Sequence, residues 1–306
     1  MEDSMQANEV TIKIAYAGVN RADLVQRAGH YPPPPGASDV LGLEVSGVID
    51  EVGKDVSDFK SGDEVCALLT GGGYAKSVTV PAGQVLPIPK GSDLKLAATL
   101  PEAFATAWYN LMMLAKLQPH ERVLLHAGAS GVGTAAVQLC NEFAADCYVT
   151  AGSAEKLQHC RTLGASGGWN RHDGDFVEAV NDWGGADVIL DPVGGDYFAS
   201  NQQVLHDDGR LIVIGLLGGR HAQIDMGRVL MKRQRIIGST LRNQSVAVKT
   251  DIMQQLHKQV WPKLAQGSIK PQLDKVFELH EVDDAHDYVS ADKNIGKVLL
   301  KVPAAD

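Results

Sequence analysis

The alternation of apolar and polar residues divides the chain into two stretches of different character. As far as residue 100, short apolar runs are separated by clusters of turn residues, as at Pro32–Gly36 and Gly71–Gly73. This pattern is typical of a small twisted β domain. It predicts strands over Glu9–Tyr16, Glu44–Val52, Asp63–Leu69, Tyr74–Val80 and Gln84–Pro87.

From about Leu100 onward, helix-like and strand-like segments alternate, which indicates an α/β unit built on a parallel sheet. Strands are expected at Val123–Leu125, Asp146–Ala151, Ala186–Asp191, Arg210–Gly215 and Arg235–Thr240. The tail predicts a helix over about Thr250–Gln266, then strands at Asp274–Leu279 and Lys297–Val302. Because strand patterns flank the α/β insert on both sides, we expect residues 1–101 and 243–306 to form one β-rich domain and residues 102–242 a second domain.

A glycine-rich turn carries the clearest chemical signal of the second domain. It joins the strand at Val123 to a helix over Thr134–Phe143, and it varies the G-x-G-x-x-G pattern by placing Ser130 in the middle position. Small residues allow a tight turn, and the amides at the start of the helix can then bind a pyrophosphate. A purely structural turn is the alternative, but the strand after the helix favours a dinucleotide site in a Rossmann-type doubly wound sheet. The residues expected to contact the cofactor here are Gly128, Ser130, Gly131, Val132 and Gly133.

The end of the next strand predicts which dinucleotide binds. An NAD site places Asp or Glu at this point, whereas this chain has Gly152 and Ser153. The missing carboxylate leaves room for a 2′-phosphate, to which Ser153 can donate a hydrogen bond and Lys156 a charged one. Arg171, which follows the next helix, can close the same pocket because a guanidinium suits a phosphate. We therefore expect NADPH as the cofactor, with solvated surface charges as the alternative interpretation of Lys156 and Arg171.

Composition excludes some classes of partner. The chain has a net charge of −9 and no basic cluster, so we expect neither nucleic acid nor an anionic membrane surface as a partner. It has no apolar run long enough to span a membrane and no signal peptide pattern at its start. Its four cysteines are scattered without a C-x-x-C pair, which indicates core thiols in a reducing compartment. We expect a cytoplasmic protein, with a cleaved organellar presequence as the alternative.

A set of short motifs extends along nearly the whole chain. They are Gly18–Asp23, Arg27–Pro34, Leu41–Gly47, Gly62–Val65, Ala127–Gly133, Gly152–Lys156, Asp191–Gly195, Gly238–Arg242 and Asn294–Lys297. Together they resemble the zinc-free quinone oxidoreductase branch of the medium-chain dehydrogenase/reductase superfamily, and within it the tumour-suppressor-inducible quinone oxidoreductase subgroup. The resemblance implies an α/β protein with a GroES-like β-rich catalytic domain and a Rossmann-type nucleotide domain. It also implies a homodimer in which a strand at a sheet edge pairs with a second subunit.

Two departures from the wider family bear on these expectations. Zinc-containing members use a Cys and a His in the segments that match Asn20 and Leu43, and their structural zinc needs a four-cysteine lobe that this chain lacks. We therefore expect no metal and a structural role for Glu44. Family members also usually begin with a further hairpin, whereas Met1–Asn8 leads almost directly into the first strand. The first hairpin of the β domain is therefore expected to be missing through truncation or to be dispensable.

The resemblance places Asn20, Tyr31 and Thr106 in a cleft over the nicotinamide, as candidate catalytic residues. The ring of Tyr31, just before a four-proline loop, can gate the cleft, and its hydroxyl can donate a proton. The plainer interpretations are a turn residue for Asn20, a loop aromatic for Tyr31 and a helix-capping or packing residue for Thr106. His126 is interpreted as packing in the core or turn. Ligands collect at the carboxyl edge of doubly wound sheets, so the cofactor is also expected to contact Val193, Gly215, Leu216 and Leu217.

These features predict an NADPH-dependent quinone oxidoreductase whose substrate is a small molecule. A quinone needs no strong general acid, because its reduced oxygens can take protons from solvent. The first alternative is an NADPH-dependent reductase of a conjugated double bond in an alkenal, enone or enoyl thioester, for which Tyr31 is the candidate proton donor. The second alternative is a non-catalytic NADPH-binding structural or regulatory protein. The sequence leaves the physiological acceptor open.

Overall fold

The computed structural model describes residues 5–303, and these residues form two compact units. The first unit takes the chain up to Ala105 and again from Leu241 onward, and the second comprises Thr106–Thr240. Residues 1–4 and 304–306 lie outside the described range. The expectation that a first hairpin is missing concerns the start of the chain and stays a prediction. Among the described residues, no helix has the length and apolar content needed to cross a membrane.

The first unit is built on a sheet in which β1 is the central strand. Its sheet has the order β12-β13-β1-β2-β3-β5, and β4 also pairs with β1. Val10, Ile12 and Ile14 point into the core at 0%, 0% and 5% exposure, so the alternating pattern at the start of β1 faces the interior as expected. The strands are β1 (Glu9–Val19), β2 (Glu44–Val52), β3 (Glu64–Leu68), β4 (Ser77–Pro81), β5 (Val85–Pro87), β12 (Leu273–Glu278) and β13 (Lys297–Lys301).

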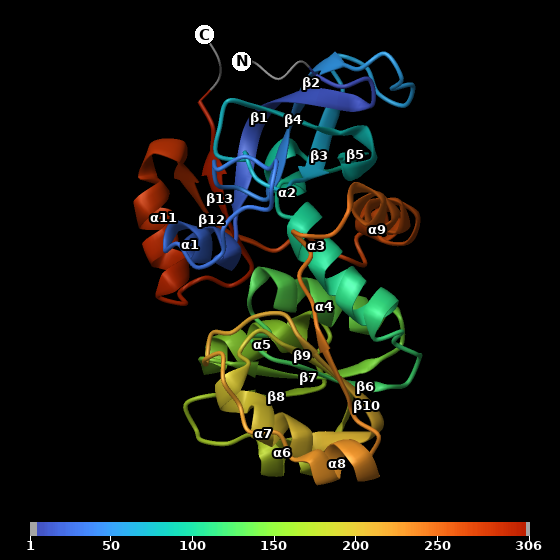
Figure 1. Ribbon diagram of the computed structural model, residues 1–306, viewed down its shortest axis with the longest axis vertical. Coiled ribbons are helices and arrows are strands. Elements are labelled where there is room, and N and C mark those ends of the chain that lie inside the picture. Colours follow the sequence, from blue (N-terminus) through green and yellow to red (C-terminus); the bar gives the residue numbers. More distant parts are fainter. Residues whose placement is uncertain (1–4, 304–306) are drawn as a thin grey trace. The chain divides into compact units, whose positions relative to one another are not determined.

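Helices of the first unit come from both parts of the chain (Figure 1). They are α1 (Arg21–Arg27), α2 (Leu94–Ala97), α9 (Val246–Gln259), α10 (Trp261–Gln266) and α11 (Val282–Ser290), while α3 (Pro101–Trp108) leads into the second unit. The single helix expected over Thr250–Gln266 is therefore wrong. Pro262 lies in the first turn of α10, where its missing N–H costs nothing, and it could not continue α9.

The second unit is a six-stranded, fully parallel sheet with the order β11-β10-β9-β6-β7-β8. The strand order reverses between β6 and β9, which is the doubly wound Rossmann arrangement. Its strands are β6 (Arg122–Leu125), β7 (Asp146–Ala151), β8 (Gly167–Asn170), β9 (Ala186–Asp191), β10 (Leu205–Val213) and β11 (Arg235–Gly238). The expected α/β fold class, with a GroES-like and a Rossmann-type part, is confirmed.

Helices cover both faces of the parallel sheet. Figure 1 shows α4 and α5 over one face and α6, α7 and α8 over the other. Their bounds are α4 (Gly131–Glu142), α5 (Ala154–Thr162), α6 (Val177–Trp183), α7 (Gly195–Val204) and α8 (Met226–Met231). Both faces of the central strands are therefore buried, and Val123, Leu124 and Leu125 are each 0% exposed.

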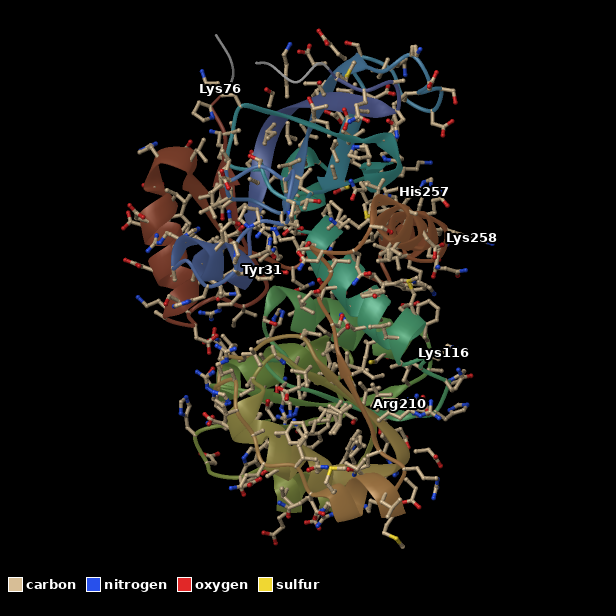
Figure 2. All side chains as sticks on the ribbon, in the orientation of Figure 1. Tyr31, Lys76, Lys116, Arg210, His257 and Lys258 are labelled. Atoms are coloured by element: carbon tan, nitrogen blue, oxygen red, sulfur yellow. The ribbon has the colours of Figure 1, made fainter. Side chains whose placement is uncertain are left out.

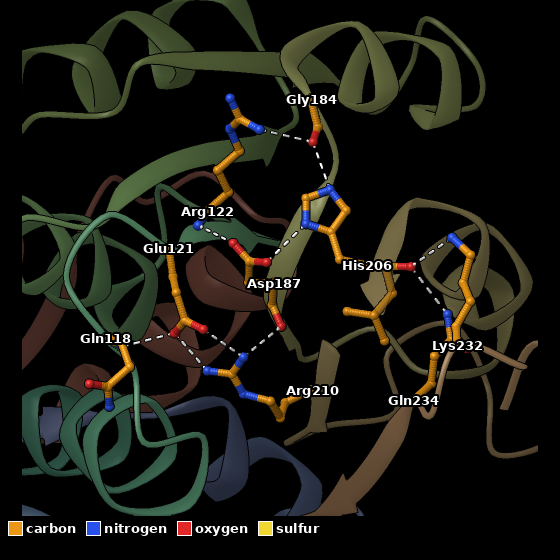
Figure 3. Close-up of polar contacts among 10 residues, drawn as sticks. Gln118, Glu121, Arg122, Gly184, Asp187, His206, Arg210, Lys232 and Gln234 are labelled. Atoms are coloured by element: carbon orange, nitrogen blue, oxygen red, sulfur yellow. Dashed lines mark hydrogen bonds and ion pairs between the residues drawn. The ribbon is translucent and has the colours of Figure 1, made fainter. Parts of the chain in front are cut away.

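Polar contacts tie together the amino ends of the central strands (Figure 3). Arg210 forms an ion pair with Glu121 at 2.6 Å. His206 contacts Asp187 at 2.9 Å and the carbonyl of Gly184 at 2.7 Å. Because these contacts lie at the edge opposite the carboxyl ends, where ligands bind in such sheets, we interpret them as structural.

Candidate functional site

The glycine-rich turn packs tightly against its neighbours. A Cβ on Gly128 would come within 2.6 Å of the Val149 side chain on β7, and one on Gly133 would overlap the carbonyl oxygens of Ala127 and Gly128. The positive φ of the turn, 52°, belongs to Ala127 rather than to a glycine. The glycines are therefore required by close approach of the turn to β7 and of α4 to the turn, not by a left-handed conformation.

Ser130 is the N-cap of α4. Its hydroxyl oxygen accepts a hydrogen bond from the amide of Gly133 at 3.0 Å, which leaves the hydroxyl hydrogen to donate elsewhere. The helix has 12 residues, so its first turn is a suitable end for an anion. The arrangement of Gly128, Ser130, Gly131, Val132 and Gly133 therefore fits the pyrophosphate of a dinucleotide.

At the end of β7, Gly152 lies beside Arg171. A Cβ on Gly152 would stand 3.2–3.3 Å from the Arg171 guanidinium, and the side chain of Arg171 is exposed. Ser153 is the N-cap of α5 and accepts the amide of Lys156 at 3.2 Å. Lys156 itself is largely buried, at 8% exposure. The structure thus brings Gly152, Ser153 and Arg171 together, and the absence of a side chain on Gly152 lets the Arg171 guanidinium approach the end of β7 closely.

The loops that follow β9 and β10 are bound to one another. The amide of Gly218 donates to the carbonyl of Val193 at 2.7 Å, and that of Leu217 to Pro192 at 3.2 Å. A Cβ on Gly215 would come within 2.7 Å of the Pro192 oxygen, so this loop contact requires a glycine. Leu216 and Leu217 are more than half exposed, at 58% and 54%. The two loops therefore form one continuous surface at the carboxyl edge of the sheet, which includes Val193, Gly215, Leu216 and Leu217.

In the first unit, the side chain of Asn20 lies within a buried ion pair. The ammonium of Lys297 is 2.5 Å from Glu44 and donates to Asn20 Oδ1 at 2.6 Å, while Asn20 Nδ2 donates to Glu44 at 3.0 Å. Glu44 is 0% exposed, and a Cβ on Gly18 would overlap its carboxylate. The amide of Asn20 is therefore engaged mainly by the protein itself, and Glu44 has structural contacts, including one at 2.9 Å from the amide of Glu102.

Tyr31 lies beside the cationic side chain of Arg242, and a second cationic side chain, Lys249, binds the same residue, Thr70, as Arg242 does. Arg242 sits 5.4 Å from the centre of the Tyr31 ring and donates to the Thr70 carbonyl at 2.8 Å. Lys249 donates to the Thr70 hydroxyl at 2.6 Å, and burial lowers its pKa to about 8. Burial also raises the pKa of Tyr31, with Glu102 adding to the effect. Figure 2 labels Tyr31 among the side chains of the first unit. Arg242 ends the Gly238–Arg242 motif, and this motif was the signal for Arg242 that the sequence offered.

Thr106 belongs to the second unit, whereas Asn20 and Tyr31 belong to the first. Thr106 lies inside α3, where its carbonyl accepts a hydrogen bond from the Asn110 side chain at 2.7 Å. The shared role of these three residues in one cleft therefore stays a prediction. Within residues 5–303, no group of three or more His, Cys, Asp or Glu side chains could hold a metal ion.

Comparisons with known proteins agree with this architecture. Residues 6–90 match the alcohol dehydrogenase GroES-like domain family, and residues 131–258 match the zinc-binding dehydrogenase family. Quinone oxidoreductase-like protein 2 of Bos taurus is 33% identical over 97% of this chain and 86% of its own length.

Solved structures of similar fold include an enoyl reductase, a quinone oxidoreductase and an alcohol dehydrogenase. CurK enoyl reductase is 32% identical, with a TM-score of 0.85 over 99% of this chain and 93% of that one. Quinone oxidoreductase of Escherichia coli, complexed with NADPH, is 25% identical, with a TM-score of 0.83 over 98% and 94%. An NAD-dependent alcohol dehydrogenase is 28% identical, with a TM-score of 0.85 over 98% and 93%.

The chain therefore belongs to the quinone oxidoreductase branch of the medium-chain dehydrogenase/reductase superfamily, as the motifs indicated. Proteins of this class are oxidoreductases that use a nicotinamide cofactor and act on small molecules.

Proposed function

We propose that the chain is a zinc-independent NADPH:quinone oxidoreductase. One observation carries the choice of NADPH: the exposed guanidinium of Arg171 stands beside Gly152, where an NAD site would have a carboxylate. Ser153 offers a hydroxyl at the same strand end. Similarity to the quinone oxidoreductase-like protein of Bos taurus and to the quinone oxidoreductase of Escherichia coli supports a quinone as the acceptor. The four free, buried cysteines support a reducing compartment such as the cytoplasm.

The residues of the chain bind and orient rather than provide strong acid catalysis. Bound NADPH supplies a hydride, and the acceptor takes up one proton to complete a two-electron reduction. The α4 amides bind the pyrophosphate. The loop surface formed by Val193, Gly215, Leu216 and Leu217 contacts the cofactor. Tyr31 donates a hydrogen bond to the acceptor, since a tyrosine hydroxyl is protonated at neutral pH and burial raises its pKa further.

Neutralising the phosphate pocket tests the coenzyme assignment. The double variant Lys156→Met, Arg171→Ala should bind NADPH about 10- to 100-fold more weakly, because a charge-assisted hydrogen bond contributes about 1.5–3 kcal/mol. Binding of NADH should not change. Isothermal titration with both coenzymes measures the effect, and Arg161→Ala, on the exposed far end of α5, is the matched control. Equal affinity of the wild type for both coenzymes, unaffected by the double variant, would refute the NADPH assignment.

A second candidate reaction is reduction of a conjugated carbon–carbon double bond. The observation that favours it is the similarity to CurK enoyl reductase over nearly the whole chain. This reaction delivers a proton to carbon, for which a positioned acid is needed.

The variant Tyr31→Phe separates the two reactions. We expect it to lose enone or enoyl-thioester reduction by about 100-fold while quinone reduction changes little, because general acid catalysis contributes roughly 10²–10⁴. Consumption of NADPH with a panel of quinones and enones measures both. An equal loss in the two reactions would limit Tyr31 to shaping the pocket. NADPH binding without turnover of any acceptor would instead indicate a structural or regulatory protein.

We also propose that a second copy of the chain covers one edge of the second unit. Strand β11 is the edge strand of its sheet, and α8 beside it in sequence buries none of its residues. Met226, Leu230 and Met231 are 67–75% exposed, and Ile236 on β11 is 39% exposed. An open edge with exposed apolar side chains is an interaction site. Pairing of β11 with the β11 strand of a second copy about a two-fold axis would give hydrogen-bond partners to the backbone groups of the edge strand. It would also bury the apolar side chains.

A further inference from the structure

A chain of buried hydrogen bonds links three strand ends of the second unit. His126 follows β6, and its Nδ1 lies 2.9 Å from the hydroxyl of Thr150 on β7. Its Nε2 lies 2.7 Å from Oδ1 of Asn201 on α7, and Asn201 Nδ2 donates to Oδ2 of Asp191 on β9 at 3.0 Å. All four side chains are at most 2% exposed. Polar groups buried to this extent are costly unless every partner is in place.

The chemistry of the four side chains fixes the direction of each bond. Both oxygens of Asp191 accept hydrogen bonds, Oδ1 from two backbone amides and Oδ2 from Asn201, so Asn201 directs its Nδ2 toward Asp191 and its Oδ1 toward His126. Nε2 of His126 therefore carries the hydrogen, and Nδ1 accepts from the Thr150 hydroxyl. Burial lowers the pKa of His126, which favours this neutral imidazole although Asp191 acts in the opposite direction. The ring packs against Phe176 and Tyr197, whose centres are 4.9 and 4.7 Å away and which also contact each other.

The last member of the chain shapes a loop of the candidate cofactor site. The second oxygen of Asp191, Oδ1, accepts the amides of Val193 at 2.7 Å and Gly194 at 3.1 Å. Gly194 has a φ of 78°, a conformation that few other residues adopt. These residues follow β9, and His126 follows β6, so the network lies where the strand order reverses. Ligands of doubly wound sheets bind at this reversal.

We propose that His126 is a positioning residue for coenzyme binding: acting through Asn201 and Asp191, it holds Val193 and Gly194 in the conformation that receives the coenzyme. It does not itself touch the coenzyme. This proposal rests on the proposed function, because only there is Val193 a coenzyme contact. The histidine thus has a role beyond the core packing that its sequence position indicated.

A matched pair of histidine variants tests the proposal. His126→Phe keeps an aromatic ring but removes both hydrogen bonds, whereas His206→Phe removes two hydrogen bonds at the opposite, amino edge of the same sheet (Figure 3). Both variants should lower thermal stability. Only His126→Phe should weaken NADPH binding, by about tenfold, and it should raise KM for NADPH more than it lowers kcat. Wild-type affinity in a folded His126→Phe protein, when the wild type binds NADPH, would overturn the proposal.

A spectroscopic test of the coenzyme-free protein examines the network directly. In Asp191→Asn the retained oxygen can still accept the two loop amides, and the introduced amide faces Asn201. Asn201 must then reverse, which moves the hydrogen of His126 from Nε2 to Nδ1. Nitrogen NMR of histidine-labelled protein reports this tautomer, with His126→Phe identifying the signal. An unchanged tautomer in Asp191→Asn would overturn the proposal. Failure of the wild type to bind NADPH would refute the proposed function while leaving the tautomer result to decide the network.

Discussion

At the scale of single residues, burial explains the structural role of Glu44 in the first unit. Glu44 and Lys297 form an ion pair that is 0% and 5% exposed at the side chains, and Asn20 bridges them. Such a pair tolerates burial only when further hydrogen bonds satisfy it. The amides and carbonyls around it do so, including the amide of Glu102. The sequence indicated a structural Glu44, but its partner Lys297 lies near the other end of the chain and no local pattern connects the two.

Asp23 gives a pH-dependent prediction at the same scale. It is 0% exposed, and burial raises its pKa to about 6 from a value of 3.8. Between these two pKa values, Asp23 is protonated in the folded state and ionised in the unfolded state. The free energy of unfolding therefore falls by about 3 kcal/mol as pH rises from about 4 to about 6. Amides of Asn20 and Gly42 and the Tyr74 hydroxyl bind the ionised form above that range.

Urea unfolding of the wild type and of Asp23→Asn from pH 4 to pH 7 measures this contribution. The free energy of unfolding of the wild type should fall relative to that of Asp23→Asn as pH rises from about 4 to about 6. The exposed substitution Asp173→Asn is the control and should follow the wild type throughout. A constant difference between wild type and Asp23→Asn across the range would contradict the assignment.

At the scale of elements, the glycines of the nucleotide site act mainly through close packing. Gly128 and Gly133 allow the turn to approach β7 and α4, and Gly215 allows the two later loops to join. The strand-like segments of the sequence predicted β2 and β9 with the bounds that the structure has. Alternation could not reveal the break at Pro262, because the apolar spacing continues through it.

Gly128→Ala tests the packing of the turn. Its Cβ would stand 2.6 Å from the Val149 side chain, so we expect a loss of about 1–3 kcal/mol in unfolding free energy and weaker NADPH binding. Gly227→Ala is the matched control, because its Cβ would meet only the exposed Asp225 carboxylate, at 3.1 Å. Urea unfolding and coenzyme titration provide both readouts. An unchanged free energy of unfolding and unchanged NADPH binding in Gly128→Ala would contradict the close contact between the turn and Val149.

At the scale of the whole molecule, the exposed edge of the second unit predicts a homodimer. Sedimentation or light scattering at micromolar concentration should give twice the chain mass for the wild type. Ile236→Lys places a charge on the edge strand β11, at the proposed interface, and should shift the equilibrium to monomer. Lys76→Glu, a surface change in the first unit, is the control. A monomeric wild type would refute the proposed interface.

The sequence by itself determined the fold class and the family, and it showed the glycine-rich motif and the Gly152–Lys156 motif, because these depend on local spacing and residue type along continuous segments. Arg171 was also accessible in this way, since the turn-and-strand order of a doubly wound sheet brings its segment to the end of β7. Only the tertiary structure could decide the partners of Asn20, the cation beside Tyr31 and the hydrogen-bond partners of His126. Each of these contacts joins side chains from segments that are distant in the sequence. Which group donates and which accepts is settled only when all the side chains of a network are in place.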